Sequence, residues 1–147
     1  MRFSKNTTVV DANVVLRYLL RDHEEFYKEA EALFNEAFSG KSKIFLLDSV
    51  VAEVVYVLSG LYRVKREEIA YVLMELLKGK GINATDKDVL FEALKIFGLK
   101  NLDFVDCLIC AYSRKFPVIS FDKKVKKCVD EISKVSNPYK CDLRDKL

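Results

Sequence analysis

The stretch that most constrains the fold is residues 7–10, a β-rich run that ends at an acidic residue, Asp11. Two threonines and two valines make this run apolar on both faces and too short for a helix, which is typical of a strand covered on both sides in a parallel sheet. In open parallel α/β sheets, ligands bind beyond the carboxyl ends of the strands. We therefore expect Asp11 to lie where the chemistry of this protein takes place.

The size and composition of the chain predict one domain that spans residues 1–147. The 147 residues are half hydrophobic, which is enough for one sizeable core. The 25 basic and 22 acidic side chains give a net charge of +3, a balance that is compatible with nucleic-acid binding without requiring it. No apolar run is long enough to span a bilayer, and the first residues do not resemble a signal sequence. We therefore expect a cytoplasmic protein that does not bind a membrane.

The order of the predicted elements is that of a doubly wound parallel sheet, because short β-rich runs alternate with helical patterns. Further strands are predicted at 43–46, 82–84 and 117–120, and the polar segment 136–147 is predicted as a last short strand or a tail. Helices are predicted at 13–21, 23–38, 50–61, 66–78, 86–97 and from about 103 to 115. The predicted fold class is α/β, a three-layer sandwich with a central parallel sheet of four or five strands flanked by helices.

Glu53 is the only charge in the helix predicted from residue 50 onward, which is apolar on nearly every side. Such a helix should be largely buried, and a buried carboxylate costs several kcal/mol unless a cation or a raised pKa offsets the cost. A capping box does not account for Glu53, because its spacing from Asp48 or Ser49 is wrong. An Arg or Lys partner from elsewhere in the chain remains an alternative to a metal ion.

Two further acidic residues, Asp103 and Asp106, lie three residues apart at the start of a predicted helix. Acidic residues are favoured in the first turn of a helix, and an N-cap role explains Asp103 by itself. Asp106 is different, because it lies beside the apolar residues of the same turn. The spacing of three places both carboxylates on one face of the helix, where they form a strongly negative site.

Asp122 follows the predicted strand 117–120 and precedes a helix, which is the same position that Asp11 has after the first strand. Helix capping is again the simpler interpretation. A basic cluster follows directly, and it is either a solvated surface or a path for the phosphates of a nucleic acid. This cluster consists of Lys123, Lys124, Lys126 and Lys127.

Helix capping explains each aspartate singly, but their combination favours a common site. Four carboxylates that meet at one edge of a sheet would repel one another unless a cation held them. They are Asp11, Glu53, Asp106 and Asp122. Oxygen ligands without His or Cys select Mg²⁺ or Mn²⁺, and water bound to such an ion can attack a phosphodiester. The sequence therefore predicts a metal-dependent nuclease.

The four cysteines do not form a convincing metal site. Cys107 and Cys110 are spaced as half of a zinc site, but they fall inside an apolar helix, where packing is the simpler role. Cys128 and Cys141 lack that short spacing, and whether they form a disulfide is left open. The single histidine, His23, lies far away in the sequence.

Four motifs, in this order, resemble the PIN domain family and are most similar to VapC-type toxins of prokaryotic toxin–antitoxin systems. They are residues 9–14, 49–54, 103–109 and 119–122. The resemblance implies a parallel sheet flanked by helices, Mg²⁺- or Mn²⁺-dependent ribonuclease activity and a homodimer. It also implies an antitoxin that blocks the site, with docking along residues 50–78.

Carried over residue by residue, the resemblance assigns metal-binding and catalytic roles to the four carboxylates named above. Asp103 matches a position that is less regularly acidic in the family. Its predicted role is to support the metal ligands without binding the metal itself. Asn13 and Ser120 match polar positions that orient water near the metal.

Two other classes of protein place an aspartate after the first strand. A haloacid-dehalogenase-like phosphatase requires Asp-x-Asp, whereas this chain has Asp11-Ala12-Asn13. A receiver domain requires an extra acidic pair before the first helix, which this chain lacks. A PIN-fold RNA-processing factor, or a non-catalytic RNA-binding or assembly module, remains the alternative to a nuclease toxin.

Overall fold

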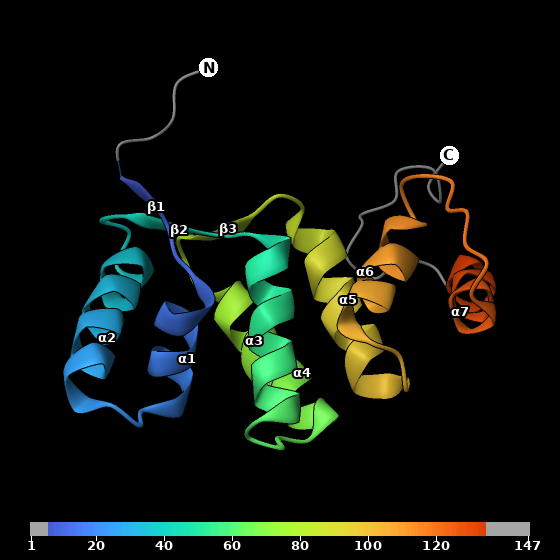
Figure 1. The fold of residues 1–147 in the computed structure, drawn as a ribbon. Helices are drawn as coiled ribbons and strands as arrows, with labels where there is room; N and C mark the ends of the chain where they lie inside the picture. The colour runs from blue at the N-terminus through green and yellow to red at the C-terminus, as the bar shows by residue number, and fades with distance from the viewer. Residues whose placement is uncertain (1–5, 135–147) are drawn as a thin grey trace.

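The computed structural model describes residues 6–134, which alternate between short strands and helices (Figure 1). The strands are β1 (Thr7–Val9), β2 (Lys43–Leu46) and β3 (Ile82–Ala84). The helices are α1 (Ala12–Leu20), α2 (Glu24–Phe38), α3 (Asp48–Gly60), α4 (Arg66–Lys78), α5 (Lys87–Leu99), α6 (Phe104–Tyr112) and α7 (Lys123–Ser133). Within these residues, no helix has both the length and the apolar character that crossing a membrane requires.

The three strands form a parallel sheet in the order β1-β2-β3. Thr8 lies opposite Ile44, and Ile44 lies opposite Ile82, so the register runs straight across the sheet. Ile44 and Ile82 are fully buried, as expected for β-branched side chains of a covered parallel sheet. The predicted α/β class and the first three predicted strands are therefore confirmed.

The segment 117–120, predicted as a fourth strand, is not a strand in the described part of the chain. It connects α6 to α7, and Ile119 is 90% exposed. Its apolar, β-branched residues satisfy the local requirement for a strand, but it pairs with none of the three strands in residues 6–134. A sheet of four or five strands in three layers stays a prediction, and the segment 136–147 lies outside the described residues.

The helices form a row that begins at α2 and ends at α7, and the sheet lies across the upper ends of the helices from α2 to α4 (Figure 1). Each helix buries one apolar face, which is why the 3.6-residue patterns predicted their positions to within about three residues. The large side chains that are most completely buried are Phe34, Ile44, Leu46, Ile69, Leu77, Ile82, Leu90 and Leu94.

Arg66, at the start of α4, fixes the chain between α5 and α6. Its Nε donates to the carbonyl of Phe97 (3.0 Å), and its Nη2 donates to the carbonyls of Lys100 (2.7 Å) and Leu102. The guanidinium also lies 3.8 Å from the centre of the Phe97 ring. The last carbonyls of a helix have no partner within the helix, so Arg66 supplies donors that the end of α5 would otherwise lack.

The other end of α6 is anchored by side chains that reach back to α3 and α5. Arg114 Nη2 lies 3.1 Å from Glu92 Oε1, and only 12% and 8% of these side chains are exposed. Lys115 pairs with Asp86, which caps α5. Tyr112 Oη donates to Asp48 Oδ2 at the start of α3 (3.1 Å). These contacts hold the end of α6 against α5 and the start of α3.

Burial alone would raise the pKa of Asp86, but the Lys115 ammonium and the backbone N–H groups of Val89 and Asp88 hold the pKa below its usual value. A carboxyl with a lowered pKa stabilises the fold above the pKa of the unfolded chain. This contribution is lost as the pH falls through the pKa of the folded state. The ion pair between Lys115 and Asp86 therefore persists at neutral pH.

We predict that Arg66→Met lowers the free energy of unfolding by about 3 kcal/mol, because three carbonyl groups lose a charged donor at once. Chemical denaturation measures the loss, with the exposed neighbour variant Lys65→Met as the control. A loss no larger than that of Lys65→Met would show that Arg66 does not hold the end of α5.

Candidate functional site

Asp11 lies two residues after the end of β1 and caps α1. Its Oδ1 accepts a hydrogen bond from the backbone N–H of Val14 (3.0 Å), so the capping role expected for an aspartate at this position is realised. The side chain is exposed and lines a cavity of about 770 Å³ together with Asn13, Arg17 and His23. The second carboxylate oxygen is not used by the cap and remains available to a ligand.

Glu53 lies in the second turn of α3 and is exposed, so the expectation that it is buried is wrong. The helix buries Val51, Val54 and Val55 but leaves one stripe open to solvent, and this stripe also carries Tyr56, which is 79% exposed. No basic residue in the described part of the chain forms an ion pair with Glu53. The burial cost therefore gives no reason for a metal here, and the case for Glu53 depends on its motif alone.

Asp106 lies in the first turn of α6 and is half-buried. Burial raises the pKa of its carboxyl above the usual range, and the negative charges of Asp122 and Asp103 raise the pKa further. Asp103 occupies the N-cap position but makes no capping hydrogen bond with its side chain. Asp103 and Asp106 line a cavity of about 810 Å³ that lies against α3 and Arg66. The two carboxylates therefore share one cavity, which Arg66 also lines.

Asp122 caps α7, because its Oδ1 accepts from the backbone N–H groups of Lys124 (2.8 Å) and Val125 (3.1 Å). The Oγ of Ser120 in turn accepts from the backbone N–H of Asp122 (3.1 Å), which fixes the approach to the helix. Both Asp122 and the basic cluster after it are exposed. Four lysines therefore surround the exposed end of α7 next to the acidic pair of α6.

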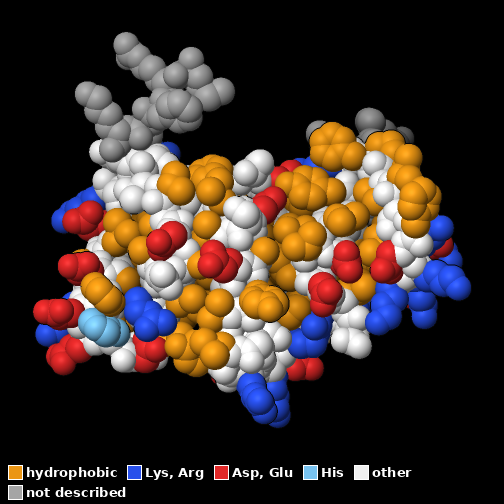
Figure 2. Space-filling model, viewed as in Figure 1, with side chains coloured by type: hydrophobic (Ala, Val, Ile, Leu, Met, Phe, Trp, Pro, Cys, Tyr) orange, Lys and Arg blue, Asp and Glu red, His pale blue; other side chains and the backbone are white. Residues whose placement is uncertain are grey.

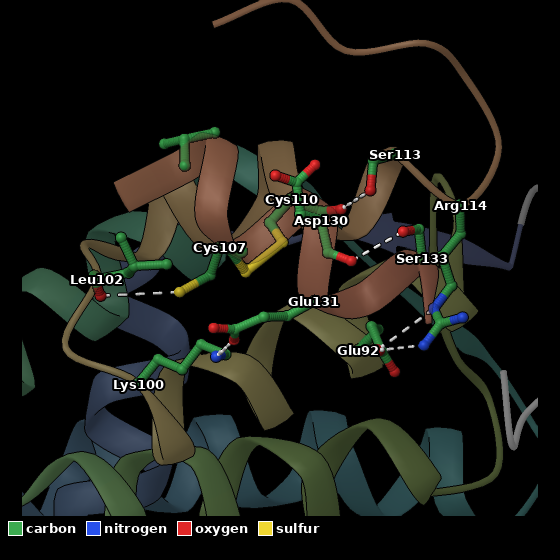
Figure 3. Close-up of a disulfide and its surroundings, with 12 residues drawn as sticks. Glu92, Lys100, Leu102, Cys107, Cys110, Ser113, Arg114, Asp130, Glu131 and Ser133 are labelled. Atoms are coloured by element: carbon green, nitrogen blue, oxygen red, sulfur yellow. Dashed lines mark hydrogen bonds and ion pairs between the residues drawn. A yellow bond between two sulfur atoms is a disulfide. The ribbon is translucent and has the colours of Figure 1, made fainter. Parts of the chain in front are cut away.

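A disulfide between Cys110 and Cys128 joins α6 to α7, with their Cα atoms 6.1 Å apart (Figure 3). Cys110 is buried in the core as predicted, but it is not a free cysteine, because Cys128 pairs with Cys110 rather than with Cys141. Cys107 does have the predicted packing role, since it is a buried free thiol whose pKa burial raises to about 12. The disulfide holds the helix of Asp122 against the helix of Asp106.

The predicted site residues form two groups rather than one. Asp106, Asp122 and Asp103 influence one another, whereas Asp11 and Asn13 line a different cavity and Glu53 lines neither cavity. Within residues 6–134, no group of three or more His, Cys, Asp and Glu side chains lies close enough together to hold a metal ion. The donor chemistry suits Mg²⁺ or Mn²⁺, but the geometry of a single chain does not assemble the ligands.

The sequence did not reveal the contacts that place these groups. The Cys110–Cys128 bond links residues 18 positions apart, and the Arg114–Glu92 pair links residues 22 positions apart. Residues so far apart in the sequence form no motif, so the sequence alone does not predict that they pair. The only hint was the presence of two further cysteines beyond the closely spaced pair.

The fold and the acidic residues define a parallel α/β domain with carboxylates beyond its first strand and at the starts of its later helices. The profile of the PIN domain family matches residues 8–130, so the chain belongs to the PIN domain family. The chain is also 31% identical over 134 residues to a VapC ribonuclease of Aquifex aeolicus (strain VF5), a match that covers 89% of this chain and 96% of that protein. No solved structure matches the chain significantly.

We predict that loss of the Cys110–Cys128 disulfide lowers the free energy of unfolding by about 3 kcal/mol, the value expected for a cross-link that closes a loop of this length. Denaturation of the wild type with and without a phosphine reductant measures the effect. The double variant Cys110→Ser/Cys128→Ser is the control, because the reductant should not change its stability further. Equal stability of the oxidised and reduced wild type would contradict the structure.

We predict that Asp106→Asn stabilises the protein at neutral pH. Because the folded-state pKa of Asp106 is raised, the ionised carboxyl destabilises the fold above that pKa, and the penalty disappears as the pH falls below the pKa of the unfolded chain. Thermal unfolding at pH 7 and at pH 3 should show a higher midpoint for the variant only at pH 7. The exposed variant Asp130→Asn is the control, and an equal gain at both pH values would contradict the assigned cause.

Proposed function

We propose that this protein is an endonuclease that hydrolyses RNA phosphodiester bonds, and that it is the toxin of a toxin–antitoxin pair. The observation that carries the proposal is the likeness to a VapC ribonuclease over nearly the whole length of both chains. The acidic pair on α6, next to Asp122 and its lysines, supports the proposal, because a phosphodiester would pass between a basic surface and a negative site that recruits a cation.

Four carboxylates are the proposed site residues; three of them lie at or near the start of a helix, and Glu53 lies in the second turn of α3. They are Asp11, Glu53, Asp106 and Asp122. We propose that three further residues support these ligands without binding the metal directly. They are Asp103, Asn13 and Ser120. Ser120 suits that role because its Oγ already fixes the backbone of Asp122. The proposed cofactor is Mg²⁺ or Mn²⁺, whose full set of ligands requires the two acidic groups to meet.

RNA is proposed to run along the basic cluster at the start of α7. These lysines are exposed and directly follow Asp122, so the phosphates that they bind would lead to the acidic site. They are Lys123, Lys124, Lys126 and Lys127. The charge is local to this helix, since the net charge of the whole chain is only +3.

The proposed protein partners are an antitoxin and a second copy of this chain. The cavity of about 810 Å³ beside α3 and α6 offers an apolar surface with Asp103 and Asp106 at its side, which suits an antitoxin segment that carries both apolar and basic side chains. It overlaps the expected docking region on residues 50–78. We propose that both partners act on the protein in the cytoplasm.

A non-catalytic RNA-binding module is the second candidate, because one observation favours it. The described part of a single chain does not gather three acidic ligands, whereas the lysines of α7 need no metal to bind phosphates. Such a module would bind RNA with equal strength in the presence and absence of divalent cations.

We predict that single-stranded RNA is cleaved by the wild type in Mn²⁺ and that Asp11→Asn reduces the rate by about 100-fold or more, as expected when a group that acts at the reacting centre is removed. Gel electrophoresis of labelled RNA measures the rate, and a chelator should abolish it. Asp130→Asn, on the exposed face of α7, is the matched control.

Equal residual cleavage by the wild type and Asp11→Asn would overturn the proposed nuclease site. RNA binding without any cleavage by the wild type would instead support the non-catalytic module.

A further inference from the structure

The cavity of about 770 Å³ beside Asp11 lies between α1 and α2. Asn13, Val14 and Arg17 line it from α1, and a second series lines it from the start of α2 onward. That series consists of His23, Phe26, Glu29, Ala30 and Leu33. Spacings of three and four residues place these side chains on one face of each helix. A cavity of this volume holds a small organic group, not only a metal ion.

Two aromatic rings form a stack at the wall of this cavity. The ring centroids of His23 and Phe26 lie 4.2 Å apart, with an angle of 20° between the ring planes. Both residues are exposed, and Phe26 is 53% exposed. Figure 2 shows a histidine side chain on the surface over the lower ends of α1 and α2, with charged and hydrophobic side chains around it. Unpaired bases of RNA stack on exposed aromatic side chains of this kind.

A hydrogen bond fixes the orientation of the histidine ring. Nδ1 of His23 accepts from the backbone N–H of Phe26 (3.2 Å), which caps α2. A neutral imidazole that accepts at Nδ1 carries its proton on Nε2, so the outer nitrogen donates to a ligand while the cap holds the ring. The cap requires only Nδ1, and it does not require the exposed ring of Phe26.

The charges along the cavity favour an uncharged aromatic group over a phosphate. Asp11 and Glu29 are acidic, and the Nη1 atom of Arg17 already lies 2.9 Å from Oδ1 of Asp22. Two carboxylates beside one paired guanidinium would repel a phosphate. A nucleobase is uncharged, and its edge carries both donors and acceptors. Glu29 accepts hydrogen bonds, whereas Arg17 and Asn13 donate them, so the cavity offers partners for both kinds of group.

The distance from Asp11 to the cavity wall fits one nucleotide. Arg17 is six residues beyond Asp11, which places it about 9 Å further along the axis of α1. A nucleotide whose phosphate lies at Asp11 extends its base over a distance of this order. The base beside the cleaved bond is therefore the group that reaches the two stacked rings.

We propose that the cavity between α1 and α2 is a subsite for one unpaired base of the RNA substrate. The base stacks on the His23–Phe26 pair, and Arg17 and Glu29 contact its edge. Since an ionised carboxylate only accepts hydrogen bonds, Glu29 favours bases with an exocyclic amino group over uracil, whose single N–H lies between two carbonyl oxygens. This inference rests on the proposed ribonuclease function, because it names a contact with the same substrate.

Binding of a labelled adenosine hexamer to the full chain in the presence of a chelator tests the stack without cleavage. Fluorescence anisotropy gives the Kd. We expect Phe26→Ala to raise the Kd about 10-fold, the effect of losing one stacked base. Tyr71→Ala is the matched control and should bind like the wild type, because Tyr71 is 65% exposed, belongs to α4 and does not line the cavity. Equal Kd values for Phe26→Ala and the wild type would overturn the proposal.

Tryptophan fluorescence reports the stacking directly, because the chain contains no tryptophan. Phe26→Trp should bind the hexamer as tightly as the wild type does, and the RNA should quench its fluorescence. Tyr71→Trp should bind equally well without quenching. Full binding by Phe26→Trp without any quenching would show that no base lies on this ring.

His23→Asn separates stacking from capping, because asparagine keeps an acceptor for the N-cap and removes the ring. We expect it to weaken binding of the hexamer several-fold with an unchanged midpoint of thermal unfolding. Wild-type binding by this variant would overturn the role of the stacked pair.

Glu29→Gln tests the contact with the base edge. The wild type should bind the adenosine hexamer more tightly than a uridine hexamer, and the variant should narrow this preference several-fold, because its amide both donates and accepts. Glu25→Gln, an exposed variant in the first turn of α2, is the control. The same preference in Glu29→Gln and the wild type would overturn the assigned contact.

The failure of this proposal and the failure of the proposed function are distinguishable. RNA binding that depends on Phe26, in a wild type that never cleaves RNA, overturns the ribonuclease function and supports the subsite. Cleavage by the wild type, with Phe26→Ala binding RNA equally well, overturns the subsite and leaves the function in place. An arginine-rich peptide that binds only when Phe26 is present, while RNA binding does not depend on Phe26, would assign the cavity to a protein partner and overturn the subsite.

Discussion

The packing of α6 against α5 decides where every acidic residue of the C-terminal half lies. Arg66 fixes the start of α6 through three carbonyl groups, and the buried Arg114–Glu92 pair fixes the chain beyond its end. Loss of Arg66 would leave carbonyl groups without a donor, and loss of either member of the Arg114–Glu92 pair would leave an uncompensated charge in the interior. They hold α6 in place, and the Cys110–Cys128 disulfide holds α7, with Asp122, against α6.

Local patterns predicted the elements of the fold well, but they did not predict how the elements meet. β1 and α1 were predicted from a short apolar run and an aspartate cap, because both signals act within four residues. Glu53 was expected in the interior because its neighbours are apolar, yet α3 buries only one face and leaves a stripe with Glu53 exposed. The segment 117–120 has the residues of a strand, but a strand needs an edge to pair with, and no local pattern shows that edge. The Cys110–Cys128 bond depends on the same long-range packing.

The acidic site is a source of instability that the rest of the fold must offset. Burial and two neighbouring carboxylates disfavour the ionised form of Asp106, and the disulfide holds the two helices together against this repulsion. Disulfides are rare in the reducing interior of mesophilic cells and common in intracellular proteins of hyperthermophiles. The sequence is rich in Lys and Glu and contains no Gln, a composition that those organisms favour. The disulfide and the composition are therefore both features that are common in proteins of hyperthermophiles.

The central claim is that carboxylates from two separate parts of the sequence share one divalent cation in the assembled protein. Paramagnetic broadening by Mn²⁺ in NMR spectra of the full chain tests this claim most directly, because the broadening reports distance from the ion and does not require RNA cleavage. We predict that the amide signals around Asp11, Glu53, Asp106 and Asp122 broaden together at the same low ratio of Mn²⁺ to protein. Broadening confined to the surroundings of Asp106 and Asp122, with the signals around Asp11 unchanged, would contradict it.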